Sequence, residues 1–305
     1  MNPSGDFRKI LRPEVVSRLS RIDLVARLVV EGFITGLHRS PYHGFSVEFS
    51  EYRPYQSGES VKNIDWRIWG RTDRFYVKQF QEETNLKSYL LLDSSASMRY
   101  ASTSASGKIS KFQYAVYLAA ALAYLMLVQR DAVGLATFDD RIRAFLPPRS
   151  VFSYLHVLLS EMTKTDNRGE TDLSGIFDSL AERIKRRGLI IVFSDLLDDQ
   201  DSVLASLKHF RHRKHEVIVF HILDPMERRL DFRTDAVFVD LETGEKLHTD
   251  PRHLAGTYRD SIGRFVDRYR RECRSHNIDY VAIDTAQPFD EALFRYLTRR
   301  KSIGG

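Results

Sequence analysis

Strongly apolar segments alternate with stretches of helical periodicity over most of this chain. The segments LKSYLLLD, AVGLATFD, GLIIVFSD, EVIVFHILD and IDYVAID cover residues 86–93, 132–139, 188–195, 216–224 and 278–284. Runs of this length and composition are typical of strands that are buried on both faces of a sheet. Because helical stretches separate them, they pair in parallel through crossover connections. The alternation predicts an α/β fold: a mostly parallel central sheet with helices on both faces.

The remaining elements follow from the segments between these strands. Helices are predicted at 108–130, 150–162, 172–186, 200–211, about 253–275 and 288–299, a short strand at 141–148, and a hairpin at 236–248. The longest apolar run, Tyr114 to Val128, has about fifteen residues, against the ~20 that a membrane-spanning helix needs. We therefore expect a buried helix there, and no membrane span.

Residues 1–85 have a different pattern and are predicted to form an N-terminal extension that precedes the main domain at 86–300. Pro13–Gly36 carries the apolar spacing of one amphipathic helix. Phe45, Val47 and Phe49 alternate as in a half-buried strand, and 75–77 indicate a strand that returns. The extension is therefore expected to be small and rich in β-structure.

Composition and charge indicate the cellular compartment and the kinds of partner to expect. The chain has 305 residues, a formal net charge of +5 and one cysteine, Cys273. A single cysteine excludes an internal disulfide and fits a reducing compartment, and the N-terminus lacks the apolar core of a signal peptide. We expect a cytoplasmic protein. Basic clusters at 183–187, 211–214, 268–273 and 299–301 are interpreted as solvated helix faces; an acidic partner surface and, less favoured, nucleic acid are the alternatives.

Polar oxygen donors follow two of the predicted strands. Asp93 ends the first strand, with Ser95 and Ser97 directly beyond it, and Asp195 ends another. In parallel sheets, ligands bind beyond the carboxyl ends of the strands. Carboxylates and hydroxyls are hard ligands suited to Mg²⁺ or Mn²⁺. Thr171, just before a predicted helix, is a further candidate for this site.

Three other interpretations apply to the segment that begins at Asp93. A phosphatase of the haloacid dehalogenase type would use Asp93 as nucleophile, but it needs a carboxylate two residues later as acid and base, where this chain has Ser95. A serine nucleophile is disfavoured because no G-x-S-x-G elbow is present. A strand end capped by small polar residues is the purely structural alternative.

The segment DSSAS matches the D-x-S-x-S motif and resembles von Willebrand factor A-like domains. Their metal-ion-dependent adhesion site adds a later threonine and a later aspartate. The resemblance places the metal ligands at Asp93, Ser95, Ser97, Thr171 and Asp195. Many relatives have Thr-Asp-Gly where this chain has Ser-Asp-Leu, so the loop after Asp195 is expected to differ in shape.

The segment YRPYQSGESVKNIDW resembles the hallmark of the domain-of-unknown-function family numbered 58. The matching residues are Arg53, Tyr55, Gly58, Glu59, Ile64, Asp65 and Trp66. Many members carry membrane helices ahead of this motif, and the chain resembles the branch that lacks them. The resemblance implies association with MoxR-type AAA+ ATPases. The interpretation is a divalent-metal-dependent protein-interaction module, an adaptor or co-factor of such an ATPase that binds a partner carboxylate, rather than an enzyme. The alternative is a metal-dependent phosphoester hydrolase that uses Asp93.

Several histidines lie outside this pattern. His209, His212 and His215 are spaced three apart in a basic run, which is interpreted as a solvated helix end. His221, inside an apolar strand, is expected to be a core residue. Asp198 and Asp199 are expected to cap the next helix.

Overall fold

The computed structural model describes residues 47–54, 66–82, 87–102, 109–128, 130–164, 172–232, 234, 236–241 and 243–287. These residues form two units, divided between Asn85 and Leu86, and each is described by itself. The helices predicted at 13–36 and 288–299 lie outside the described residues, as do Thr171 and the motif residues from Tyr55 to Asp65.

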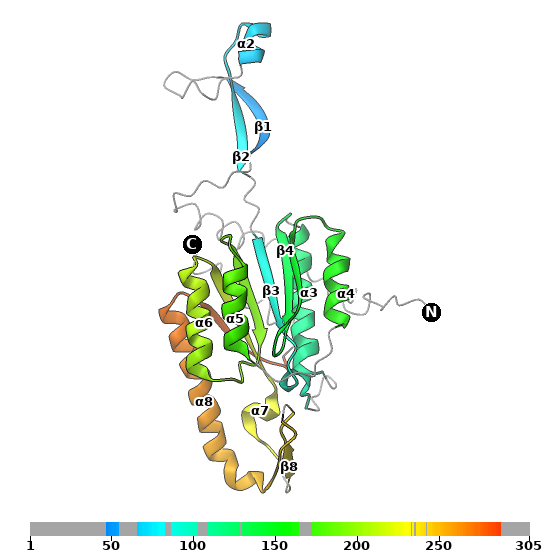
Figure 1. The fold of residues 1–305 in the computed structure, drawn as a ribbon, viewed down its shortest axis with the longest axis vertical. Helices are drawn as coiled ribbons and strands as arrows, with labels where there is room; N and C mark the ends of the chain where they lie inside the picture. The colour runs from blue at the N-terminus through cyan, green and yellow to red at the C-terminus, as the bar shows by residue number, and fades with distance from the viewer. Residues whose placement is uncertain are drawn as a thin grey trace, which may run out of the picture. The chain divides into compact units, whose positions relative to one another are not determined.

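The larger unit is built on one twisted sheet, drawn in Figure 1. In the described part of the chain this sheet has six strands in the order β10-β7-β6-β3-β4-β5. Their bounds are Asp279–Asp284, Glu216–Leu223, Leu189–Ser194, Lys87–Asp93, Ala132–Phe138 and Ile142–Arg149. All neighbours are parallel except β5, which runs antiparallel to β4 at one edge. The predicted α/β class and mostly parallel sheet are confirmed.

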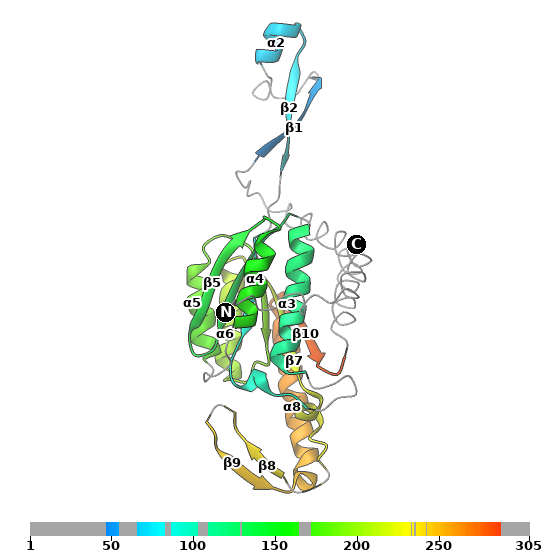
Figure 2. The same ribbon diagram turned by 90° about the vertical axis from the view of Figure 1, so that its right-hand side faces the viewer.

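Helices cover both faces of the sheet (Figures 1 and 2). On one face lie α3 (Lys111–Val128) and α4 (Tyr154–Lys164); on the other lie α5 (Leu173–Arg183), α6 (Gln200–His212) and α8 (Pro251–Ser275). The strands alternate their side chains between the two layers, so Tyr89 and Leu91 join the core beneath α5 and α6. Burial of each large apolar side chain contributes about 1.5–3 kcal/mol, which favours this layered arrangement.

Helix α3 is apolar around most of its circumference. It contacts four strands, β3, β4, β6 and β7, and it also packs against α4. Among the described residues, this is the one helix long and apolar enough to cross a membrane, and 72% of that segment is buried within the protein. A helix with apolar residues on all sides is typical of the interior of a large domain, as predicted for residues 114–128.

The connection from β7 to α8 forms an additional substructure. It contains the short helix α7 (Pro225–Arg229) and the antiparallel hairpin of β8 (Ala236–Val239) and β9 (Lys246–Thr249). The hairpin was predicted at 236–248. Because it follows the carboxyl end of β7, it leaves the sheet from the edge where β3 and β6 also end (Figure 2).

The smaller unit pairs β1 (Val47–Pro54) with β2 (Tyr76–Glu82) in an antiparallel hairpin. The expectation of β-structure is confirmed for these segments. Helix α2 (Trp66–Thr72), which lies between them in sequence, was not predicted. Trp69 stacks on Phe75 with ring centroids 5.9 Å apart, and Trp66 contacts both rings edge to face.

Candidate metal centre

Asp93 is the last residue of β3 and is fully buried at the carboxyl edge of the sheet. Its Oδ1 accepts a hydrogen bond from the backbone N–H of Ser95 at 2.9 Å. Its Oδ2 accepts one from the hydroxyl of Ser194 at 2.5 Å. Ser194 ends the neighbouring strand β6, so the two strand ends hold this carboxylate from both sides.

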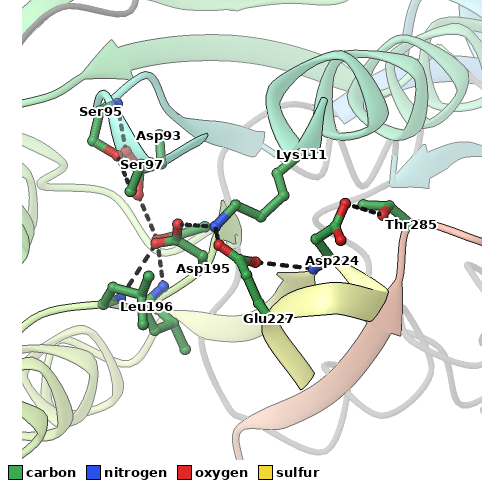
Figure 3. Close-up of polar contacts among 11 residues, drawn as sticks. Asp93, Ser95, Ser97, Lys111, Asp195, Leu196, Asp224, Glu227 and Thr285 are labelled. Carbon is green, nitrogen blue, oxygen red and sulfur yellow. Dashed lines mark hydrogen bonds and ion pairs between the residues drawn. The ribbon is translucent and has the colours of Figure 1, made fainter. Parts of the chain in front are cut away.

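Ser95 and Ser97 lie on the turn that follows Asp93, where a short 3₁₀ helix covers Ser97–Arg99. Their hydroxyl oxygens are 3.0 Å apart. The Ser97 hydroxyl also donates a hydrogen bond to the Asp195 carboxylate (Figure 3). The structure thus brings together four of the five predicted ligands: Asp93, Ser95, Ser97 and Asp195.

The loop after Asp195 keeps a glycine-like backbone although it lacks glycine. Leu196 has a φ of 55°, in the left-handed region that favours glycine. Its N–H donates to the Ser194 hydroxyl at 2.9 Å, and its side chain is fully buried. At this position, then, a leucine adopts a backbone conformation that glycine adopts more readily.

Thr171, the fifth predicted ligand, lies outside the described residues, but its neighbour in the chain is fixed near this edge. Asp172 caps α5 by accepting from the N–H of Gly175. Asp198, on the loop after β6, accepts from the N–H of Leu173 at 2.9 Å. Asp199 caps α6 as predicted, whereas Asp198 connects the Asp195 loop to the start of α5.

Sequence reasoning missed Lys111, the first residue of α3. Its ammonium lies 2.7 Å from Oδ2 of Asp195 and 2.5 Å from Oε1 of Glu227 (Figure 3). The lysine side chain is 0% exposed. Glu227 also accepts from the N–H of Asp224 within the capping box of α7. Lysine at the polar start of a helix is ordinarily solvated, so nothing local in the sequence indicated this contact.

The buried charged groups of this site shift one another's pKa values. Burial, together with the nearby charge of Asp195, raises the pKa of the Asp93 carboxyl to about 7. Burial would also raise the pKa of Asp195, but the ammonium of Lys111 outweighs it and holds that pKa below its usual value. Burial alone would lower the pKa of Lys111, and the two carboxylates raise it instead. Of the two carboxylates among the described candidate ligands, Asp195 is thus paired with the buried Lys111 and Asp93 is not.

The donor set fits a hard divalent cation. The Ser95 and Ser97 hydroxyls hydrogen-bond to each other, with their oxygens 3.0 Å apart. Two ligands at adjacent corners of an octahedron with bonds of about 2.1 Å lie about equally far apart, so the two oxygens could hold one cation without moving far. Of the described lysines and arginines, none pairs with Asp93 as Lys111 pairs with Asp195, and a cation would relieve the repulsion between Asp93 and Asp195. Among the described residues, no group of three or more histidine, cysteine, aspartate or glutamate side chains is arranged for a metal. The hydroxyls are therefore essential to this candidate.

Comparison with known families matches the model described as "Protein of unknown function DUF58" to residues 51–270. That span covers well over half of the chain. The chain belongs to the DUF58 family. The match begins one residue before the N-terminal motif and ends within α8, so it includes every described residue of the candidate site.

Relatives of this DUF58 chain include the uncharacterized proteins Rv1480 of Mycobacterium tuberculosis and Mb1516 of Mycobacterium bovis. Each is 25% identical over 298 residues, which is 95% of this chain and 90% of the relative. Similar solved structures include BatB from Bacteroides thetaiotaomicron, with 15% identity, a TM-score of 0.44 and coverage of 71% of this chain and 99% of that one. The SpRpn10 VWA domain has 14% identity, a TM-score of 0.38 and coverage of 69% and 94%.

Three histidines singled out in the sequence are not among the candidate ligands of this DUF58 chain, although His221 lies beside Asp195, whose charge and backbone both act on its imidazole. His209 pairs with Asp178, as a partly exposed helix residue does. His215 was predicted to be solvated, and this is wrong: it is fully buried, with Nε2 3.1 Å from the carbonyl oxygen of Ile184. His221 is a core residue, as predicted, with Nδ1 2.5 Å from the Tyr280 hydroxyl.

Proposed function

We propose that this DUF58 protein is a divalent-cation-dependent protein-interaction module that binds a carboxylate of its partner through Mg²⁺ or Mn²⁺. The observation that supports this most directly is the convergence of Asp93, Ser95, Ser97 and Asp195 at one edge of the sheet. Neutral hydroxyls supply much of this donor set. A cation held in this way stays electron-poor and retains exchangeable water, which a partner's carboxylate can displace.

Each residue has a distinct role in this proposal. Ser95 and Ser97 would hold the cation through their hydroxyl oxygens. Asp93, fixed by Ser194 and by the N–H of Ser95, orients the first hydroxyl and supplies negative charge. Asp195 accepts from Ser97 and orients the second. The cation itself supplies the Lewis acidity that attracts the partner's carboxylate.

The β8–β9 hairpin supports a protein as the partner. Its valines Val237 and Val239 and its Leu247 are 49%, 47% and 60% exposed. An isolated two-stranded hairpin is marginally stable in water, and exposed apolar side chains near a candidate site are typical of interaction surfaces. The hairpin leaves the same edge of the sheet as Asp93 and Asp195. A partner that reaches the cation would therefore meet apolar contacts beside it.

The family resemblance suggests a MoxR-type AAA+ ATPase, or its client protein, as this partner. On this proposal the chain acts as an adaptor or co-factor for remodelling, and it requires neither a small-molecule substrate nor nucleic acid.

Biolayer interferometry with the purified chain and the MoxR-type ATPase of the same genome tests the proposed cation-dependent binding. Binding should require Mg²⁺ or Mn²⁺, disappear in EDTA and be lost in Asp93→Asn. The matched control is Asp139→Asn. Asp139 is also a buried carboxylate that follows a neighbouring strand, but it pairs with Arg143, so binding should persist. Cation-independent binding, or equal binding by Asp93→Asn, would refute the proposed contact.

The alternative, a phosphoester hydrolase with Asp93 as nucleophile, is less well supported. Both carboxylate oxygens of Asp93 accept hydrogen bonds, and the side chain is fully buried, whereas a nucleophile must reach the phosphorus atom. Ser95 also stands where the acid and base would be required. Hydrolysis of p-nitrophenyl phosphate that depends on Mg²⁺ and on Asp93 would favour this alternative instead.

A further inference from the structure

We propose that Lys111 is a resident cation of this site, which occupies the position of a second metal ion between Asp195 and Glu227. The inference rests on the proposed function, because it concerns how the same site selects its cation. Its ammonium lies 2.7 Å and 2.5 Å from one oxygen of each carboxylate, and its side chain is 0% exposed.

The backbone around Lys111 fixes the ammonium in this position. The N–H of Lys111 donates to the carbonyl oxygen of Tyr100 at 3.1 Å, which anchors the start of α3 to the turn that carries the serines. Glu227 is held from the other side, since its Oε2 accepts from the N–H of Asp224 at 3.0 Å. The lysine thus has little freedom to leave the two carboxylates.

The charge balance explains what this lysine does. Three carboxylates, Asp93, Asp195 and Glu227, converge here, and Lys111 supplies one positive charge to two of them. Without it, the buried Asp195 and the partly exposed Glu227 would lie close together with no lysine cation between them, which is unfavourable. Carboxylate oxygens about one cation are also the ligands of a divalent metal. Lys111 therefore prevents a metal from binding between Asp195 and Glu227, and it leaves the incoming cation to Asp93, the serines and the partner.

The lysine also connects two parts of the molecule. Asp195 lies on the loop after β6, and Glu227 belongs to α7, which leads into the exposed hairpin. Lys111 joins both (Figure 3). It is a positioning residue, which acts on the candidate cation through Asp195.

Manganese titration of Lys111→Gln and Lys111→Met by calorimetry and thermal unfolding tests this inference. In EDTA, both variants should unfold at lower temperature than the wild type. Added Mn²⁺ should raise their unfolding temperature by much more than that of the wild type, with an affinity roughly tenfold higher or more, as for residues that tune metal ligands. Lys111→Arg keeps the charge and should respond as the wild type does. Lys111→Gln is the milder change, since its amide still donates a hydrogen bond.

Double variants separate this inference from the proposed function. Lys111→Gln with Asp93→Asn should keep the added manganese response, because the new ligands are Asp195 and Glu227. Lys111→Gln with Glu227→Gln should lose it. If neither lysine variant responds to Mn²⁺ more than the wild type, the inference is wrong and Lys111 is only structural. Failure of the proposed function appears separately, as wild-type manganese binding that Asp93→Asn does not reduce.

Discussion

Leu196, next to the candidate ligand Asp195, adopts an unfavourable backbone conformation. Its left-handed backbone, with φ of 55°, costs about 1–2 kcal/mol for a residue with a side chain. The fully buried leucine side chain offsets that cost through packing, and its N–H is held by the Ser194 hydroxyl. The unfavourable burial of the Lys111 ammonium is offset in a similar way, because two carboxylates stabilise its charge.

The pH dependence of the free energy of unfolding tests the pKa of another buried group, His221. Burial lowers the pKa of His221 to about 4, whereas an unfolded histidine titrates near 6.5. The unfolded state therefore binds more protons between these values, so stability is full above pH 6.5 and falls as pH decreases toward 4. The loss is on the order of 3 kcal/mol.

Urea denaturation of the wild type and His221→Phe across this pH range measures the effect as a difference. The difference in stability between the two proteins should change in favour of the variant as pH falls. A constant difference between wild type and His221→Phe would mean that this imidazole protonates normally in the folded protein.

The residues of the site divide into those that a sequence reveals and those that it does not. Asp93, Ser95 and Ser97 lie within five residues of one another, so one segment displays their pattern. Lys111 meets Asp195 across 84 residues and Glu227 across 116. Only the packing of α3 against two strand ends brings these three together, and no local pattern encodes that. His215 was misjudged for the same reason, because its partner lies 31 residues away.

At the scale of elements, long apolar patterns were more informative than short ones. The strands β3, β6 and β7 were predicted within one or two residues, because buried strands end sharply at a polar residue. Helix α2 was missed because WRIWGRT contains tryptophans and a glycine, which are weak helix formers. Helix α7 has only five residues, yet the capping box of Asp224 with Glu227 and the proline at its first position were signals in the sequence.

Substitutions at two glycines test how closely neighbouring elements pack. A Cβ atom at Gly188 would lie 2.3 Å from the carbonyl oxygen of Lys87, where β3 begins, whereas one at Gly263 in α8 would have nothing within 4 Å. Gly188→Ala should therefore destabilise the protein by about 1–3 kcal/mol through overpacking. Gly263→Ala should stabilise it by about 0.5–1 kcal/mol, because alanine is the better helix residue. Urea denaturation of both variants measures this, and a Gly188→Ala protein as stable as the wild type would contradict the close approach of Gly188 to β3.

For the molecule as a whole, the carboxyl edge of the central sheet brings together the candidate metal ligands and the exposed hairpin. The strand ends place Asp93 and Asp195 together, and the β7–α8 connection adds α7 and the apolar hairpin at the same edge. The formal net charge of +5 would favour approach of an acidic partner. These features support the proposed binding surface.

Tryptophan fluorescence gives a separate measurement of the smaller unit, because Trp66 and Trp69 are the two tryptophans of the chain. They are 57% and 39% exposed. The emission of the full chain should therefore resemble that of tryptophan in water and be quenched readily by acrylamide. In Trp66→Phe, the remaining Trp69, which stacks on Phe75, should be quenched less. Blue-shifted emission with weak quenching would show that these rings are covered in solution.

Calorimetric titration of Mn²⁺ into the wild type, Asp93→Asn and Asp139→Asn tests the central claim most directly. The account predicts one manganese ion bound by the wild type and by Asp139→Asn, and none by Asp93→Asn. Equal binding by all three proteins would place the ion elsewhere. Absence of binding by the wild type at millimolar Mn²⁺ would contradict the claim that Asp93, Ser95, Ser97 and Asp195 form a cation site on their own.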